Sequence, residues 1–575
     1  MEGPGREGAR ASRRARLGGR FRAPSLPDGT RPERDRPRAW YSRAMPASFL
    51  WYDLETFGLD PAADRVAQFA AVRTDGEFRE KGEPVLLYCK PAKDYLPDPR
   101  SCMVHGITPA HADEAGIGEY EFAKALRAEM LVPGTTTGGY NTLAFDDEFV
   151  RHLFWRNLFD PYEREWANGN SRWDLIDLAR AARDLRPEGV VWPNRDDGRP
   201  SFRLEALAKA NGIAHENAHD ALSDVRATIG LARLLRERQP KLFRWYWTHR
   251  SRDSLTRLVD LVERTPLVHA AAGFTSERGC TTLVAPLAVD PANRNNLFAV
   301  DLRFDPEAIL ELGPDEIRAR AFAKGEELEG ARVPLVKIRL NRCPFLAPAA
   351  TLSAEAAERL GLDAAAAEKR RALLARHPEL IQKMVAAFEL PGPREESPDP
   401  ELRLYSGSFV GDDDKARLAK VHAAIDELGP AAAKREAYAL KFRDERLAQL
   451  LRRFWARNFP ETLPPAEAGR WRDFCAARLQ LPQGEGRVDL AEYGRLVMAR
   501  LDDPATPARD RALLHALLSW KRALEDEVLS WSGAARESVA GGLPPGSADG
   551  PREPVAGGLP PGSPPGTGAR PDADS

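Results

Sequence analysis

The chain has 575 residues, 43% of them hydrophobic, so it is too long for one core and predicts about three or four domains of ~150 residues. A formal net charge of −2 at pH 7 excludes a globally basic nucleic-acid-binding protein, and any basic binding surface must be local. The sequence has no apolar run near the ~20 residues that a membrane span needs. Its five cysteines are scattered without a CxxC motif, which argues against a zinc site or a disulfide framework.

Both ends of the chain have an unusual composition. Residues 1–44 are rich in Arg, Gly and Pro with almost no aliphatic periodicity, and we expect them to be a disordered leader. Met45 shortly precedes the first apolar run, so we expect translation to start there. Residues 533–575 contain the nonapeptide Val-Ala-Gly-Gly-Leu-Pro-Pro-Gly-Ser twice, at 539–547 and 555–563, which is typical of a disordered tail.

Residues 46–240 begin with strands and continue with helices. Three apolar runs at 48–53, 66–74 and 84–90 read as strands, with Thr74-Asp75-Gly76 as a turn signal. Helical spacing of apolar residues follows at 120–131, 149–159, 171–185, 202–210 and 221–235. This order predicts an α/β domain built on a mixed sheet with helices packed on it.

Two further regions follow. Residues 241–392 contain short β-like segments at 281–287, 297–302 and 333–340, which indicate a small β-barrel-like domain with helical inserts at 354–388. A Pro/Glu/Ser linker covers 391–400. Residues 400–532 contain amphipathic segments such as 415–428 and 443–458, and predict a helical domain.

Asp53 and Glu55 end the first apolar strand, two residues apart, so both side chains point to the same face. Two carboxylates on one face of an aromatic strand repel each other unless cations lie between them. The alternative is an exposed strand end that carries two solvated acids.

Asp146 follows Gly138-Gly139-Tyr140-Asn141 and begins a predicted helix. An Asp at a helix start is also a favoured cap, which is the alternative function for this residue. Asp147 and Glu148 offer the same charge nearby, so spacing alone does not choose among the three.

His219 and Asp224 are five residues apart, with the histidine in a loop and the carboxylate one turn into the next helix, so both can reach one cleft. The other nine histidines, such as His105, His152 and His377, lie in no comparable pattern, and a lone histidine is usually structural. Together, however, four carboxylates can hold two hard divalent cations and a histidine can deprotonate water. Two-metal phosphodiester hydrolysis uses this combination.

The chain also carries longer motifs, two of which contain candidate site residues named above. Phe49-Leu50-Trp51-Tyr52-Asp53-Leu54-Glu55-Thr56, Ser201-Phe202-Arg203-Leu204-Glu205 and Ala218-His219-Asp220-Ala221 are three of them, and Ala456-Arg457-Asn458-Phe459-Pro460 is another near the C-terminus. With them the chain resembles the DEDDh 3′→5′ exonucleases, and within these the bacterial exodeoxyribonuclease I family, over about residues 48–530. Leu54 departs from that family, which has an aromatic residue there, but this position points away from the acids.

The resemblance implies a fold and a site. The fold is a ribonuclease H-like exonuclease domain (46–240), an SH3-like β domain (241–392) and a C-terminal helical domain (400–532). Asp53, Glu55, Asp146 and Asp224 would be metal ligands for two Mg²⁺ ions, for which Mn²⁺ can substitute, and His219 would be the general base. The family thereby favours Asp146 over Asp147, and it implies that Glu55 meets the terminal 3′-hydroxyl and that Arg203 contacts nucleic acid.

The expected substrate is single-stranded DNA, which requires a basic track with stacking aromatic rings. Candidates are Arg151, Tyr162, Trp166, Arg180 and Arg186, with ordinary packing or solvated surface as the alternative. The family also implies a monomer in DNA repair and recombination that binds the C-terminal tail of single-stranded DNA-binding protein. The cysteines and the Ala/Arg/Gly/Pro-rich composition indicate a bacterial cytoplasmic protein. Alternative functions are exoribonuclease activity, or a non-catalytic single-strand-binding scaffold.

Overall fold

A computed structural model describes residues 48–215, 220–323, 328, 330–389, 397–481 and 488–540, with the backbone alone at 528, 529 and 531–540. The predicted leader 1–44, Met45, His219 and residues 541–575 lie outside the described residues. Within that described part, all five cysteines are buried and free. None of its helices combines the length and apolar character needed to cross a bilayer.

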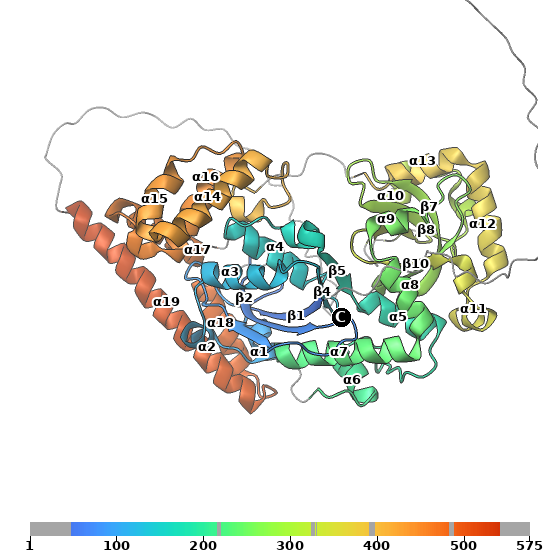
Figure 1. The fold of residues 1–575 in the computed structure, drawn as a ribbon, viewed down its shortest axis with the longest axis horizontal. Coiled ribbons are helices and arrows are strands. Elements are labelled where there is room, and N and C mark those ends of the chain that lie inside the picture. Colours follow the sequence, from blue (N-terminus) through green and yellow to red (C-terminus); the bar gives the residue numbers. More distant parts are fainter. Residues whose placement is uncertain are drawn as a thin grey trace, which may run out of the picture. The chain divides into compact units, whose positions relative to one another are not determined.

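The first domain is built on a five-stranded mixed sheet (Figure 1). Its strands are β1 (Ser48–Thr56), β2 (Val66–Thr74), β3 (Val85–Tyr88), β4 (Thr135–Gly139) and β5 (Ser171–Asp174), in the order β3-β2-β1-β4-β5. β1 pairs antiparallel with β2 and parallel with β4. The central strand β1 is apolar on both faces, because each face is covered by helices.

The helices form one layer on each side of this sheet. Phe49 and Trp51 of β1 pack on one face with Val225 and Ile229 of α7 (Ala221–Arg238). Leu50 and other residues of the opposite face pack with α3 (Glu119–Met130) and α4 (Asp146–Arg156). Figure 1 shows α7 on one side of β1 and α3 and α4 on the other. The remaining helices are α1 (Pro99–His105), α2 (Pro109–Ala115), α5 (Ile176–Leu185), α6 (Leu204–Ala210) and α8 (Pro240–Thr248).

Two strands differ from the sequence expectation. Residues 171–174, expected as the start of a helix, form β5, which pairs parallel with β4. Trp173 is fully buried there, with its ring centroid 6.0 Å from that of Trp51, so pairing and burial outweigh the local helical spacing. β4 itself has the sequence Thr-Thr-Thr-Gly-Gly, which lacks an apolar pattern, although all five residues are buried.

The second domain contains a five-stranded antiparallel sheet and confirms the expected β domain with helical inserts. Its strands are β6 (Leu267–Ala270), β7 (Thr281–Val289), β8 (Asn296–Asp301), β9 (Leu335–Arg339) and β10 (Phe345–Pro348), in the order β10-β6-β7-β8-β9. Its helices are α9 (Arg252–Thr256), α10 (Pro314–Phe322), α11 (Ala354–Leu360), α12 (Ala364–Arg376) and α13 (Pro378–Ala386). One face of this sheet shares a continuous apolar core with α5, α7 and α8 of the first domain.

The third domain is helical, as expected. It comprises α14 (Asp412–Leu428), α15 (Pro430–Ala439), α16 (Glu445–Asn458), α17 (Pro465–Gln480), α18 (Leu490–Asp502) and α19 (Ala508–Ala540). The last helix continues past residue 532, at which the domain was expected to end. Phe454 and Trp455 of α16 join the core that contains Tyr120 and Phe154, so this domain packs directly on the first domain.

A buried ionic network also joins the first and third domains. Arg457 donates to Asp94 Oδ2 at 3.0 Å and to Glu401 Oε1 at 2.7 Å, and Arg65 lies 3.3 Å from Glu401 Oε2. These four side chains are at most 5% exposed. Burial alone would raise the pKa of Glu401, but the neighbouring arginines lower it to about 2, so the carboxylate stays charged.

Candidate active site

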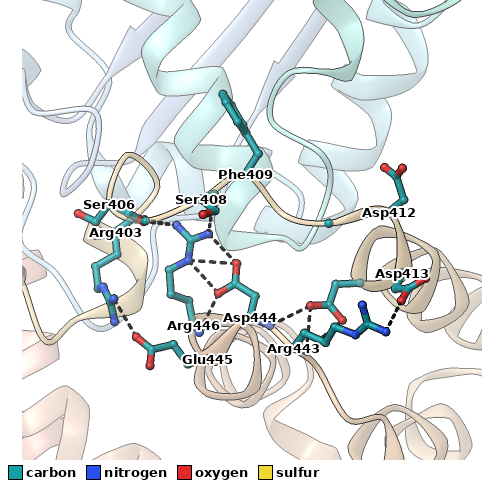
Figure 2. Close-up of a pocket in the computed structure, with 13 residues that line it drawn as sticks. Arg403, Ser406, Ser408, Phe409, Asp412, Asp413, Arg443, Asp444, Glu445 and Arg446 are labelled. Carbon is teal, nitrogen blue, oxygen red and sulfur yellow. Dashed lines mark hydrogen bonds and ion pairs between the residues drawn. The ribbon is translucent and has the colours of Figure 1, made fainter. Parts of the chain in front are cut away.

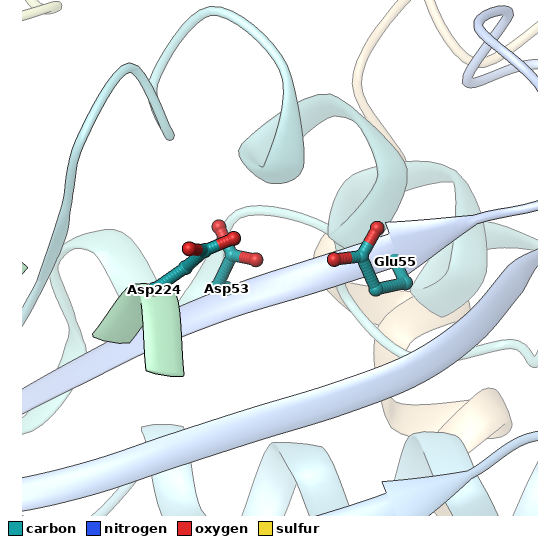
Figure 3. Close-up of side chains that lie close together, drawn as sticks. All are labelled: Asp53, Glu55 and Asp224. Atoms are coloured by element: carbon teal, nitrogen blue, oxygen red, sulfur yellow. The ribbon is translucent and has the colours of Figure 1, made fainter. Parts of the chain in front are cut away.

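Three carboxylates converge at the end of β1 (Figure 3). Asp53 and Glu55 come from β1 and Asp224 comes from the first turn of α7, and one oxygen of each lies within 4.8 Å of the others. Asp53 and Glu55 follow Phe49 and Trp51 at alternating positions, so they continue the same strand face beyond the apolar core. Leu54 points into the opposite core. The acids therefore collect where the apolar surface of this face ends.

The electrostatics of this group favour a bound cation. Burial raises the pKa of Asp53 well above its ordinary value, and the charges of Asp146, Glu55 and Asp224 raise it further. Burial likewise raises the pKa of Glu55, with Asp224 as the next cause. A divalent cation between these carboxylates would reverse both effects. All donors are carboxylate oxygens, which suit hard ions such as Mg²⁺ or Mn²⁺, so the residues fit the implied metal.

Asp146 is the first residue of α4 and is 4% exposed. One of its carboxylate oxygens, Oδ1, accepts a hydrogen bond from the Leu54 N–H at 3.0 Å, which ties it to β1 between the two acids of that strand. Burial raises the pKa of Asp146 to about 8. Asp146 is outside the group of three, yet its charge is the largest carboxylate effect on the pKa of Asp53, so it faces the same site.

The two acids after Asp146 have other partners. The Asp147 carboxylate accepts from Arg164 at 2.6 Å and from Arg172, and these cations lower its pKa although burial opposes them. Glu148 binds Arg151 at 2.9 Å and also binds Arg342 and Tyr405. Among the three acids that spacing left open, the geometry therefore favours Asp146.

The loop before Asp146 is held by the end of β5. The carboxylate of Asp174 accepts the N–H of Asn141 at 2.8 Å and that of Leu143 at 3.0 Å. Asn141 has φ of 64°, in the left-handed region that Asn tolerates better than most residues. The hydroxyl of Tyr140 donates to Phe202 O at 2.6 Å. These contacts fix the turn that delivers Asp146 to the site.

His219 lies outside the described residues, but His215, four residues before it in the sequence, is placed. His215 is 5% exposed, and its Nε2 bonds directly to Asp224 Oδ1. The expectation that the other histidines belong to no constellation is therefore wrong for this one. The sequence carried a signal for this residue, since His215 lies only four positions before His219, in His215-Glu216-Asn217-Ala218-His219.

Three family models match the chain in sequence order. They are Exonuclease at residues 50–232, Exonuclease I SH3-like domain at 250–390 and Exonuclease I C-terminal domain at 398–524. Exodeoxyribonuclease I of Escherichia coli (strain K12) is 46% identical over 426 residues, which are 74% of this chain and 88% of the relative. The chain belongs to the exodeoxyribonuclease I family. It is an exonuclease, and the expected three-domain fold is confirmed.

Two solved structures of exonuclease I add detail about relatives. The zinc-bound form of the E. coli ExoI–ssDNA complex has a TM-score of 0.77 and 42% identity, and the match covers 84% of this chain and 100% of that one. SSB/Exonuclease I in complex with the inhibitor CFAM has a TM-score of 0.75 and 42% identity, covering 83% and 100%. The zinc ion, the single-stranded DNA and SSB are thus components of relatives' structures.

The candidate substrate residues of this exodeoxyribonuclease I family member differ in accessibility. Arg203 is exposed and occupies the N-cap position of α6 without a side-chain capping hydrogen bond, and Trp166 is 64% exposed. Arg151 and Arg180 are buried against the carboxylates of Glu148 and Asp177, so their geometry favours a packing role. Arg186 donates to Thr351 O of the SH3-like domain at 3.0 Å.

An aromatic residue of the C-terminal domain joins this surface and was missed in the sequence. Phe409 is 79% exposed, and its ring centroid lies 5.3 Å from that of Tyr162, which is itself stacked under Arg151. Nothing in the local sequence of Phe409 distinguishes it from a core residue, because its neighbour Tyr162 lies far away in the sequence, in the bend before a short 3-10 helix of the first domain.

A cavity of about 550 Å³ lies beside the loop that carries Phe409 (Figure 2). Arg446 spans one wall, donating to Arg403 O at 2.8 Å and Ser408 O at 2.7 Å and pairing with Asp444. Phe409 is itself among the residues that line this cavity, and Figure 2 shows its ring pointing away from the ion-paired side chains of the wall. The cavity contains none of the clustered acids, and several of its charged side chains pair with one another, among them Arg446 with Asp444 and Arg403 with Glu445, so it is not the active site.

Proposed function

We propose that this exonuclease removes 5′-mononucleotides from the 3′ end of single-stranded DNA by two-metal hydrolysis. The observation that carries the proposal is the convergence of Asp53, Glu55 and Asp224, with Asp146 at the start of α4 hydrogen-bonded to β1 beside them. The single-stranded DNA bound in a relative's structure supports the choice of substrate. The exposed rings of Trp166 and Phe409 offer stacking surfaces that unpaired bases can use.

Each residue of the site has a distinct part. Asp53, Glu55, Asp146 and Asp224 would hold two Mg²⁺ ions, and we expect Mn²⁺ to substitute. Bound there, the ions supply Lewis-acid stabilisation of the phosphodiester oxygens. Glu55 accepts the terminal 3′-hydroxyl of the DNA, and Arg203 binds a phosphate. Neutral His219 takes the proton from the attacking water, and His215 orients Asp224 through their hydrogen bond.

The biological setting is part of the same proposal. We infer a monomeric bacterial cytoplasmic enzyme that acts in DNA repair and recombination. The SSB/Exonuclease I structure supports binding to single-stranded DNA-binding protein, and we propose that the C-terminal tail of that protein is the segment bound.

The test is a comparison of substrates with and without metal. The purified chain is incubated with 3′-labelled single-stranded DNA, the matching RNA and blunt duplex DNA, in Mg²⁺ or in EDTA. We expect Mg²⁺-dependent release of labelled 5′-mononucleotide from single-stranded DNA, with much slower release from the other two. Equal release from RNA would indicate an exoribonuclease. DNA binding without metal-dependent release would indicate a scaffold.

A further inference from the structure

Arg342 of the SH3-like domain contacts residues on both sides of Asp146 in the sequence. It lies in the turn between β9 and β10, and its Nη1 donates to Leu143 O at 3.0 Å. Its Nη2 binds the Glu148 carboxylate. Leu143 precedes Asp146 by three residues and Glu148 follows it by two, so one guanidinium spans the start of α4. A fixed, planar guanidinium with two engaged nitrogens is well suited to hold such a segment rigidly.

The C-terminal domain reaches the same carboxylate from another direction. The Tyr405 hydroxyl binds Glu148 Oε2, and it also lies 3.2 Å from Arg151 Nη1. Arg151 completes the contact with Glu148 within α4 at 2.9 Å. Glu148 is therefore bonded by residues of all three domains. The SH3-like and C-terminal domains thus both contact the helix that begins with Asp146.

We propose that Arg342 is a positioning residue for the Asp146 carboxylate, and that Tyr405 supports the same helix start through Glu148. The inference rests on the proposed function, in which Asp146 is a metal ligand. Asp146 is tied to β1 by one hydrogen bond from Leu54, and the rest of its placement depends on the backbone around it. A shift of ~1 Å in such a group lowers rates strongly, because ligand geometry is demanding. In this arrangement the accessory domains complete the metal site.

A role for Arg342 in DNA binding is the alternative. Its side chain is 21% exposed and its two terminal nitrogens are engaged within the protein, which disfavours that role. Arg339 supplies a matched comparison, because it lies three residues earlier in the same segment and is exposed. The two arginines carry the same charge, so loss of charge alone affects both variants alike.

The experiment measures Mn²⁺ binding to the full chain by electron paramagnetic resonance, for wild type, Arg342→Met and Arg339→Met. Loss of a group that orients a metal ligand typically weakens metal affinity by about 10–100-fold. We expect Arg342→Met to bind Mn²⁺ about 10-fold more weakly, and Arg339→Met to bind it as wild type does. Single-turnover hydrolysis by Arg342→Met should recover as Mn²⁺ is raised, and its affinity for single-stranded DNA in Ca²⁺ should match that of Arg339→Met.

Two milder variants, Arg342→Lys and Tyr405→Phe, test the inference if Arg342→Met folds poorly. Arg342→Lys keeps the charge and loses the two-pronged grip, and Tyr405→Phe loses one hydroxyl, so both should weaken Mn²⁺ binding in folded protein. Unchanged Mn²⁺ affinity in folded Arg342 variants would overturn the inference. A wild-type chain that binds no Mn²⁺ would instead contradict the proposed function itself.

Discussion

His215 Nε2 and Asp224 Oδ1 are directly hydrogen-bonded, at the point where the loop before α7 meets the carboxylate cluster. Hydrogen bonds of this kind orient a ligating carboxylate, and they explain why a histidine without access to substrate can affect a metal site. His215 and His219 are four residues apart in the sequence but should have separable roles.

His215→Gln should raise the Mg²⁺ concentration needed for half-maximal activity by about 10-fold, the lower end expected for loss of a group that orients a ligand. The rate at saturating Mg²⁺ should stay within about threefold of wild type, because the proposed mechanism assigns proton transfer to His219 and not to His215. Titration of activity against Mg²⁺ measures both quantities. An unchanged Mg²⁺ requirement would show that the hydrogen bond from His215 to Asp224 does not affect metal binding.

His219→Ala should lower kcat by roughly 10²–10⁴-fold, the usual range for a lost general base, with little change in the Mg²⁺ requirement. The wild-type rate should rise with pH as the imidazole, with an ordinary pKa of ~6.5, becomes neutral. Rates across pH for wild type, His219→Ala and His215→Gln provide the measurement. If His219→Ala keeps both the wild-type rate and its rise with pH, His219 is a structural residue.

Asp224→Ala should abolish Mg²⁺-dependent hydrolysis and leave binding of single-stranded DNA measurable in Ca²⁺. In the proposed mechanism the carboxylate would hold a cation, whereas affinity for the strand would come from phosphate and stacking contacts spread over the surface. Product release and a filter-binding assay test the two parts separately. Near-normal turnover would remove Asp224 from the site.

Metal removal should make stability fall with rising pH. The pKa of Asp146 is raised to about 8 in the folded protein, against ~3.9 in the unfolded chain. The native state then binds more protons than the unfolded state between about pH 4 and 8, so its stability decreases as pH rises through that window. The buried histidines His152 and His422, whose pKa values burial lowers, act in the opposite direction below about pH 6.5.

Comparison with Asp146→Asn cancels those other groups. In EDTA the variant should be more stable than wild type at pH 8 by at least about 1 kcal/mol, since one pKa unit corresponds to about 1.4 kcal/mol, and the difference should shrink toward pH 5. Mg²⁺ should reverse the order. Thermal melts at both pH values measure this, and a difference that does not depend on pH would show that Asp146 is ionised without metal.

Arg457→Met should destabilise the protein by about 3–5 kcal/mol, because it leaves Asp94 and Glu401 buried beside a smaller positive charge. Arg443→Met is the control: Arg443 is 79% exposed and pairs with Asp413, and such surface pairs contribute about 0–1 kcal/mol. Urea unfolding at pH 7 gives both values. Equal stability of the two variants would contradict the structural importance of the network.

The sequence predicted the elements whose signal is local. The apolar runs of β1 and β2, the helical spacing of α3 and α7, and the pair Asp53 and Glu55 on one strand face needed no knowledge of the rest of the fold. β4 and β5 were not predictable in this way, because Thr135–Gly139 carries no apolar pattern and becomes a strand through its pairing with β1. Parallel pairing between distant segments is invisible to local periodicity.

The site shows the same division. The spacing predicted that Asp146 begins a helix, but it could not choose among Asp146, Asp147 and Glu148. These three acids differ in the residues that they contact, and local spacing does not show those contacts. Arg164, Arg172 and Arg342 lie 17, 25 and 194 positions from the acids they bind. The sequence pattern did not predict a role for His215, because that role depends on its contact with Asp224 and not on the residues next to it in the sequence.

The ionic network of Asp94, Arg65, Glu401 and Arg457 has a consequence for how this enzyme can be divided. The family models for the first and third domains match separate segments of the chain. Arg65 and Asp94 nevertheless belong to the first domain, and Glu401 and Arg457 belong to the third. A fragment that ends before residue 398 would keep Arg65 and Asp94 while exposing the apolar surface that Phe454 and Trp455 now cover. The exonuclease domain therefore matches a family model of its own, but it depends on the third domain for burial and charge pairing. Chimaeras should be joined inside surface loops of the third domain and not at its border.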